Sequence, residues 1–272
     1  VGGTGHIIGR SSDSFIGGGG ANHITGSLLS VIGGGCCNCI VDTTGSFIVG
    51  GKSNLITNSG YSSINGGGSN TITTSPSSSI LSGIDNAIFK LGYFSLIGGG
   101  KSNSICISPG SSIVGGISSG ITASNCSFIG GGENHNIFTA NHSAIVSGIN
   151  NNVTGSCSII AGGCNNTISN DATLSIIGGG RCNSIVATGT DHSIVGGNGN
   201  CIDGGESGPS IIGGGSGNYL SATVDSFIGA GEDNSIISGQ CSVIVGGELN
   251  TVTSNDAGIL GGSGNCVVHN YS

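Results

Sequence analysis

The chain has 272 residues, of which 58 are glycine and only 7% are charged, and its formal net charge is -8 at neutral pH. This acidic balance excludes nucleic acid as an expected partner, because no stripe of Lys and Arg is available to neutralise phosphates. No run of about 20 apolar residues occurs, so we also expect no direct insertion into a membrane.

One phrase returns along the chain at intervals of about sixteen residues. It reads SFIGGGGANHITG from Ser14, SVIGGGCCNCIVD from Ser30 and SFIVGGKSNLITN from Ser46. Further phrases begin at residues 62, 78, 95, 111, 127, 143, 158, 175, 192, 210, 226, 242 and 257. With a partial phrase before Ser14, about seventeen coils cover the sequence, and we predict one continuous β-solenoid repeat domain over residues 1–272.

Two apolar rows run through these phrases when the first residue of each is counted as position 0. Position 2 is Ile in every complete phrase, and position 10 is Ile, Val or Leu. Because the rows are half a repeat apart, they indicate two short strands per coil, each sending one side chain inward. The predicted core rows include Ile16, Ile32, Ile48, Ile64, Ile80 and Ile97 at position 2, and Ile24, Ile40, Ile56 and Ile72 at position 10.

Glycine and asparagine mark the bend between the two strands. The glycine pair at positions 4 and 5, such as Gly18 and Gly19, allows positive φ angles, and Asn at position 8 also tolerates left-handed backbone and bonds to nearby main chain. Stacked about 4.8 Å apart, these amides would form a ladder. The predicted ladder includes Asn22, Asn38, Asn54, Asn70, Asn86 and Asn103. The fold class is therefore all-β, a parallel β-solenoid or β-roll.

The outward positions 1 and 3 of the first strand are apolar in most coils. A long apolar stripe is rare on a soluble monomer, so we expect copies of the chain to pack along it as a homo-oligomer. The alternative is that these side chains reflect strand preference alone. The predicted assembly face comprises Phe15, Val31, Phe47, Leu96, Phe128, Ile176, Ile211 and Phe227.

The alternation S-x-I-x-G-G-x-x-N-x-I resembles the head repeats of YadA-like trimeric autotransporter adhesins, and similar repeats occur in fibre proteins of phages and giant viruses. The resemblance covers essentially the whole chain. It implies a left-handed β-roll that trimerises lengthwise and binds a host glycan or surface protein. Family repeats are often shorter and carry Ala where Ile stands here, and residues 1–272 contain no heptad stalk or membrane anchor. These departures favour a viral or phage fibre.

The sequence gives little support for catalysis or for a bound metal. The 11 cysteines follow no fixed frame. Cys126, His142 and Cys157 end three successive coils and are weak candidates for a soft-metal site, although a row about 4.8 Å apart is loose for tetrahedral coordination. Acidic residues are scattered rather than gathered in a cleft. We therefore expect no enzyme activity, no catalytic residues and no cofactor.

The expected function is a structural, non-enzymatic segment of a fibre or adhesin head, outside the cell on a virion or cell surface. The chain begins without Met or a signal-like segment, and we interpret it as a fragment or mature piece. Irregular loops at residues 90–94, 171–174, 189–192 and 203–209 are the expected places for receptor contact. One alternative is an ice-binding solenoid, because Thr71-Ile-Thr73 and Thr251-Val-Thr253 have the Thr-x-Thr form. Another is a solenoid that forms filaments or matrix.

Overall fold

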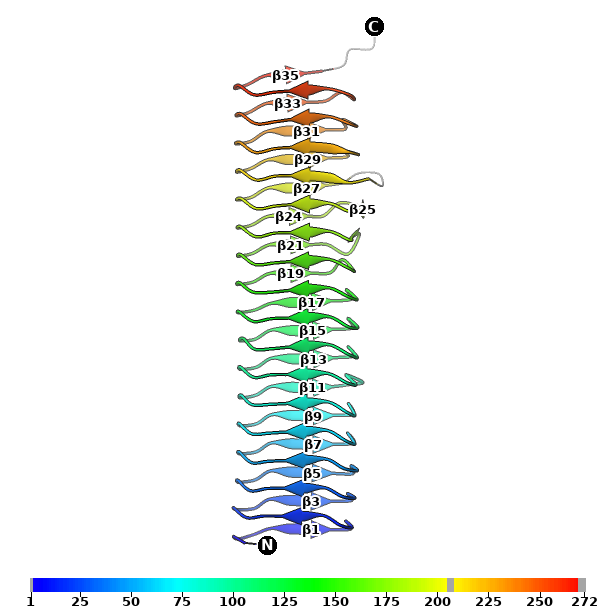
Figure 1. Ribbon diagram of the computed structural model, residues 1–272, viewed down its shortest axis with the longest axis vertical. Coiled ribbons are helices and arrows are strands. Elements are labelled where there is room, and N and C mark those ends of the chain that lie inside the picture. The colour runs from blue at the N-terminus through cyan, green and yellow to red at the C-terminus, as the bar shows by residue number, and fades with distance from the viewer. Residues whose placement is uncertain (1, 205–207, 269–272) are drawn as a thin grey trace. The chain divides into compact units, whose positions relative to one another are not determined.

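The computed structural model describes residues 2–204 and 208–268 and confirms the predicted fold class, since those residues form parallel strands in coils of about 16 residues and no helix (Figure 1). The chain divides into two compact units, which we call unit 1 (Val1–Asn134) and unit 2 (His135–Ser272). Each is described by itself. Among the described residues there is no helix of the length and apolar character needed to cross a membrane.

Unit 1 contains two walls of short parallel strands. The strands at positions 1 and 2 form the first wall, and those at positions 9 to 11 form the second wall. The first wall consists of β2 (Phe15–Ile16), β4 (Val31–Ile32), β6 (Phe47–Ile48), β8 (Ser63–Ile64), β10 (Ser79–Ile80), β12 (Leu96–Ile97), β14 (Ser112–Ile113) and β16 (Phe128–Ile129). The second wall consists of β1 (Ile7–Gly9), β3 (His23–Thr25), β5 (Cys39–Val41), β7 (Leu55–Thr57), β9 (Thr71–Thr73), β11 (Ala87–Phe89), β13 (Ser104–Cys106) and β15 (Gly120–Thr122).

Unit 2 repeats this plan with two irregular additions. Its first wall consists of β18 (Ala144–Ile145), β20 (Ile159–Ile160), β23 (Ile176–Ile177), β26 (Ser193–Ile194), β28 (Ser210–Ile212), β30 (Ser226–Ile228), β32 (Val243–Ile244) and β34 (Gly258–Ile259). Its second wall consists of β17 (Asn136–Phe138), β19 (Asn152–Val153), β21 (Thr167–Ile168), β24 (Ser184–Ile185), β27 (Cys201–Asp203), β29 (Tyr219–Ser221), β31 (Ser235–Ile237), β33 (Thr251–Val252) and β35 (Cys266–Val267). The additions, β22 (Ala172–Thr173) and β25 (Gly189–Thr190), pair with each other.

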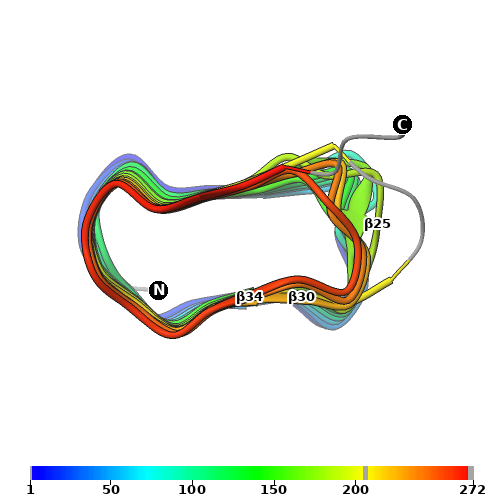
Figure 2. The same ribbon diagram turned by 90° about the horizontal axis from the view of Figure 1, so that it is seen from above.

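Within each unit, equivalent residues of successive coils stack in register. Phe15 pairs with Val31 and Ile16 pairs with Ile32 on the first wall, and the same one-coil step continues along the unit. Viewed from above, the coils within unit 1 follow one flattened outline, and those within unit 2 also share one except at the bend around β25 (Figure 2). A residue type at one position of the repeat therefore becomes a continuous column on the surface or in the core.

The core between the walls is narrow and alternates apolar with polar columns. Every residue of the predicted Ile rows is fully buried. Serines at position 0 are buried beside them, and the hydroxyl of one serine accepts a hydrogen bond from the amide of the serine one coil later, as in Ser62 N to Ser46 Oγ at 3.3 Å. Fully burying each Ile contributes about 1.5 to 3 kcal/mol. Stability therefore depends on both the Ile columns and the satisfaction of the polar columns.

The left-handed residues of the bends are not the ones that the sequence analysis predicted. In each glycine pair only the second member has a positive φ, as Gly67 does at 86°. Asn at position 8 is not left-handed; the residue before it is, as Ser69 shows with a φ of 55°. Two further left-handed positions, 12 and 15, occur in the bend after the second wall and are often held by residues other than glycine, such as Ile107. The stacking of backbone hydrogen bonds fixes these conformations against local preference.

Candidate functional surfaces

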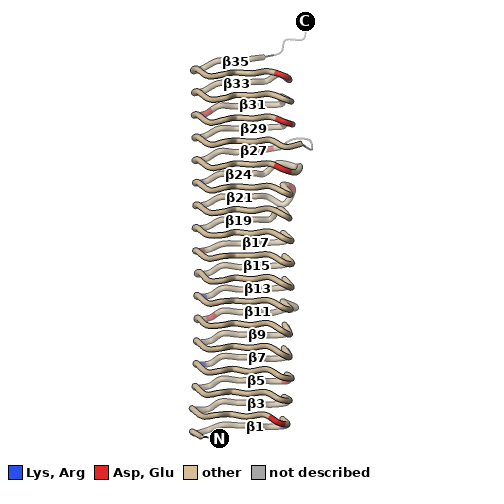
Figure 3. Tube along the Cα trace, viewed as in Figure 1, with Lys and Arg blue, Asp and Glu red and all other residues tan. Residues whose placement is uncertain are grey.

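The outer surface of the first wall is apolar in both units. Phe15 is 53% exposed and Phe47 44%, and Val31, Phe128, Ile176, Ile211 and Phe227 are also exposed, while Leu96 is partly buried. Figure 3 shows that charged residues lie mainly at the bends of the coils. Among the described strands only β27 contains a charged residue, Asp203. The predicted assembly face is thus an uncharged outer surface within each unit.

On this face, a large side chain at position 1 is usually accompanied by a small one at position 3, and a small one at position 1 by a large one at position 3. Where position 1 is Phe15, position 3 is Gly17, and the edge of the phenyl ring would lie 3.4 Å from a Cβ placed on that glycine. Where position 1 is Ser112, position 3 is Val114, which is 54% exposed. Phe227 with Gly229 repeats the first arrangement in unit 2. Most coils therefore add one large apolar side chain, which makes the face more even than either position alone.

The outer surface of the second wall is less regular. Thr57 and Thr73 are neighbours in register, and Leu55 pairs with Thr71. Phe89 and Cys106 then continue the column of Thr73. The threonine columns considered for ice binding are therefore interrupted within unit 1.

The Asn column is fully buried at every predicted position. Its hydrogen bonds run chiefly to the main chain. The Asn70 side chain donates to the carbonyl oxygens of Gly66 (3.0 Å) and Gly83 (2.9 Å) and accepts from the backbone amide of Asn86 (3.0 Å). Direct amide-to-amide bonds also occur at some steps, such as Asn86 to Asn70 at 3.2 Å. The ladder therefore ties each coil to the next, and at each step it pairs a backbone amide such as that of Asn86.

The weak metal candidates are exposed on the surface of their units. Cys126 is exposed in unit 1, and His142 and Cys157 are exposed in unit 2. Over residues 2–204 and 208–268, no group of three or more His, Cys, Asp or Glu side chains is arranged to hold a metal ion. All cysteines are free thiols, and the Sγ atoms of Cys36 and Cys37 lie 3.0 Å apart.

Two titratable groups in unit 2, the half-buried Cys201 and the buried His192, have displaced pKa values. Burial, together with the nearby carboxylate of Asp203, raises the pKa of the Cys201 thiol to about 11, so this thiol stays protonated at neutral pH. His192 is 1% exposed and stands at position 0, where serine is usual. Neither of its ring nitrogens has a hydrogen-bond partner. Burial lowers the pKa of His192, and the charge of Asp191 opposes that shift more weakly.

His192→Ser is expected to make unit 2 less sensitive to acid. Because the folded state lowers the pKa of this imidazole, the unfolded chain binds the proton more tightly, and stability present above pH 6.5 is lost as the pH falls below it. Thermal unfolding of the wild type and the variant at about pH 7 and pH 5 measures this loss. The exposed His142→Ser serves as the control. Equal pH dependence in wild type and His192→Ser would contradict the attribution of this acid sensitivity to His192.

The irregular loops expected to contact a receptor have different structures. Residues 90–94 extend one coil of unit 1 by a residue and expose Leu91 and Phe94. Residues 171–174 and 189–192 contain the paired strands β22 and β25. Residues 205–207 of the fourth loop lie outside the described residues.

Comparison with known proteins adds no family assignment. The sequence matches no protein-family model and no curated protein. The resemblance to YadA-like heads and viral fibres therefore remains a prediction from the repeat itself.

Proposed function

We propose that this chain is a structural, non-enzymatic attachment segment of a fibre or adhesin head, which assembles with copies of itself through the first wall. The observation that supports the proposal is the even apolar surface formed by compensation between positions 1 and 3. In a lone chain this surface would face water over many successive coils, whereas soluble monomers rarely expose a continuous apolar patch of more than a few hundred Å².

The proposed assembly is a homotrimer displayed on a virion or cell surface. The number three and the location come from the resemblance of the repeats to YadA-like heads and viral fibres. Association would bury the phenyl rings of the first wall and leave the bends and the second wall exposed. Several copies of one weak contact site would then act together and strengthen attachment by avidity.

The oligomeric state tests this proposal directly. Sedimentation equilibrium at micromolar concentrations is expected to give a multiple of the chain mass of 26.2 kDa, with three copies as the predicted number. Combining Phe15→Lys, Phe47→Lys and Phe128→Lys is expected to give monomers, because each buried and unpaired ammonium would cost several kcal/mol.

A matched control places the same charges on the second wall. Thr25→Lys, Thr57→Lys and Thr122→Lys together change the net charge equally but should leave the assembly intact. A wild-type protein that sediments as a monomer throughout this range would refute the assembly proposal. So would a control that dissociates as fully as the phenylalanine variant.

A further inference from the structure

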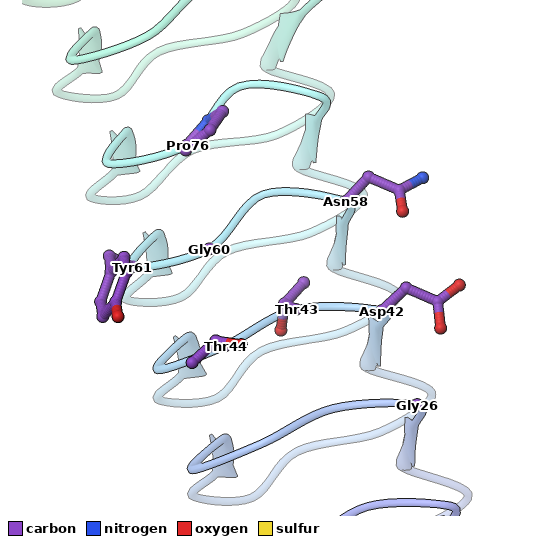
Figure 4. Close-up of a pocket in the computed structure, with 8 residues that line it drawn as sticks. All are labelled: Gly26, Asp42, Thr43, Thr44, Asn58, Gly60, Tyr61 and Pro76. Atoms are coloured by element: carbon purple, nitrogen blue, oxygen red, sulfur yellow. The ribbon is translucent and has the colours of Figure 1, made fainter.

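An open groove lies on the bend that follows the second wall in unit 1. It has a volume of about 620 Å³ and spans several successive coils. In Figure 4, Asp42 and Asn58 project from one edge and the ring of Tyr61 stands at the other. The groove is lined by Gly26, Asp42, Thr43, Thr44, Asn58, Gly60, Tyr61 and Pro76.

Tyr61 gives the groove an exposed aromatic edge. Its side chain is 70% exposed, although its backbone amide is bonded to the carbonyl of Thr44 at 2.8 Å. The ring lies over Gly45 of the preceding coil, where an added Cβ would be 2.9 Å from the ring carbon Cδ1. The ring is thus held beside a residue without a side chain and is available for stacking.

The opposite edge and the floor supply hydrogen-bonding groups. The exposed Asp42 carboxylate can accept hydrogen bonds, and the exposed Asn58 amide can both donate and accept them. Neither side chain has a hydrogen bond to another described residue in the structure. Gly60 adds no side chain between Thr44 and Pro76, so the floor between the two edges stays low.

This combination restricts the chemistry of a ligand. An open groove cannot enclose a small apolar molecule as typical ligand pockets do. No Lys or Arg lines it, and Asp42 would repel an anionic group. A peptide adding to a strand edge needs free main-chain groups, but the amides of Gly45 and Tyr61 are already bonded to the preceding coil. A pyranose ring meets the remaining conditions, since it has an apolar face for the aromatic ring and hydroxyl groups that donate and accept.

A second aromatic residue extends the surface along the coils. Phe94 is 73% exposed and occupies the same repeat position as Tyr61, two coils further on, at about 9.6 Å by strand spacing. Large and small residues alternate at this position through that part of unit 1, as Leu29, Gly45, Tyr61, Ser77, Phe94 and Gly110. The alternation separates the two rings by a small residue, so a chain of sugars could contact both.

We propose that this groove, continued by Phe94, binds an uncharged glycan whose sugar rings stack on Tyr61 and Phe94 and whose hydroxyl groups bond to Asp42, Asn58 and Thr44. The biological role of this site rests on the proposed attachment function. The geometry itself lies within unit 1 and needs no second chain. Each copy in an assembly would contribute one such surface.

Binding of the full-length chain to a printed glycan array tests the site. The array should carry neutral oligosaccharides together with sialylated and sulfated ones. We expect signals for neutral glycans, and a loss of at least about tenfold in apparent affinity for Tyr61→Ser combined with Phe94→Ser, since stacking supplies the main apolar contact. Serine is chosen because Ser77 occupies the same position in the intervening coil. Tyr61→Phe should retain most of the binding.

The exposed aromatic Phe138 of β17 provides a matched control, and Phe138→Ser should leave binding unchanged. Circular dichroism of each variant checks that the fold is kept. No neutral signal, binding only to anionic glycans, or full binding by the double variant would overturn this proposal. Sedimentation of the same samples separates the two proposals: a trimer that binds no glycan refutes only the groove, and a monomer that binds glycan refutes only the assembly.

Discussion

Gly67→Ala is expected to destabilise unit 1 by about 3 to 5 kcal/mol, from left-handed backbone strain and overpacking together. Gly67 has a φ of 86°, and an added Cβ would collide with the carbonyl oxygen of Gly83 in the next coil. It would also lie 2.7 Å from the Nδ2 atom of Asn70. Neither obstacle is the flexible end of an exposed side chain, so the coils would have to separate locally.

The adjacent glycine provides the control for this change. Gly66 has no heavy atom within 4 Å of an added Cβ and no positive φ. Gly66→Ala should therefore change the free energy of unfolding by less than about 1 kcal/mol. Urea unfolding followed by circular dichroism measures both variants. Similar midpoints for the two would contradict the close approach of the coils at Gly67.

The repeat made the fold predictable because one structural requirement recurs in every coil. Ile16 and Ile24 are half a repeat apart, and only two short strands facing one another bury both columns. The resulting Ile and Asn columns are buried as the pattern indicates. Their register follows directly, since a slip by one residue would expose the Ile columns.

The conformation of the bends could not be predicted in the same way. The sequence presents the glycines at positions 4 and 5 as a pair, but only the second lies against the next coil. The sequence did contain a sign that only position 5 requires glycine. Position 4 is occupied by Ser82, Ser147 and Ala230 in three phrases, whereas position 5 is glycine in every complete phrase. Ile107 gave no such sign. A β-branched residue rarely adopts left-handed backbone, and here the stacking of the coils imposes that conformation.

Of the two candidate surfaces, the apolar face of the first wall could be predicted from the sequence and the groove could not. The compensation between Phe15 and Gly17 was readable in the sequence, because both residues are outward neighbours on one strand. The groove was not readable, since it joins side chains three repeat positions apart and depends on the missing side chain of Gly60. The direction in which Asp42 and Tyr61 project is set by left-handed residues that composition does not reveal.

Asn70→Ala is expected to destabilise unit 1 by about 3 to 5 kcal/mol, because it leaves the buried Asn86 amide and the part-buried Gly66 carbonyl without their partners. The Asn86 amide would lose the Oδ1 atom that it donates to, and the Gly66 carbonyl would lose the Nδ2 donor. The Gly83 carbonyl would keep only its bond from the Gly68 amide. Urea unfolding should show the loss, whereas Asn65→Ala, at an exposed asparagine of unit 1 without a positive φ, should stay within about 0.5 kcal/mol of wild type.

Asn70→Asp distinguishes a hydrogen-bond role from simple filling of space. The carboxylate has nearly the same shape and can still accept from Asn86, but it cannot donate to the carbonyl oxygens of Gly66 and Gly83. Burial beside those oxygens would raise its pKa above that in the unfolded chain, so the folded state would bind the proton more tightly. Acidification should therefore reduce the stability difference between this variant and wild type. A variant as stable as wild type at neutral pH would show that the column needs only the volume of asparagine, and the role assigned to its amide nitrogen would be wrong.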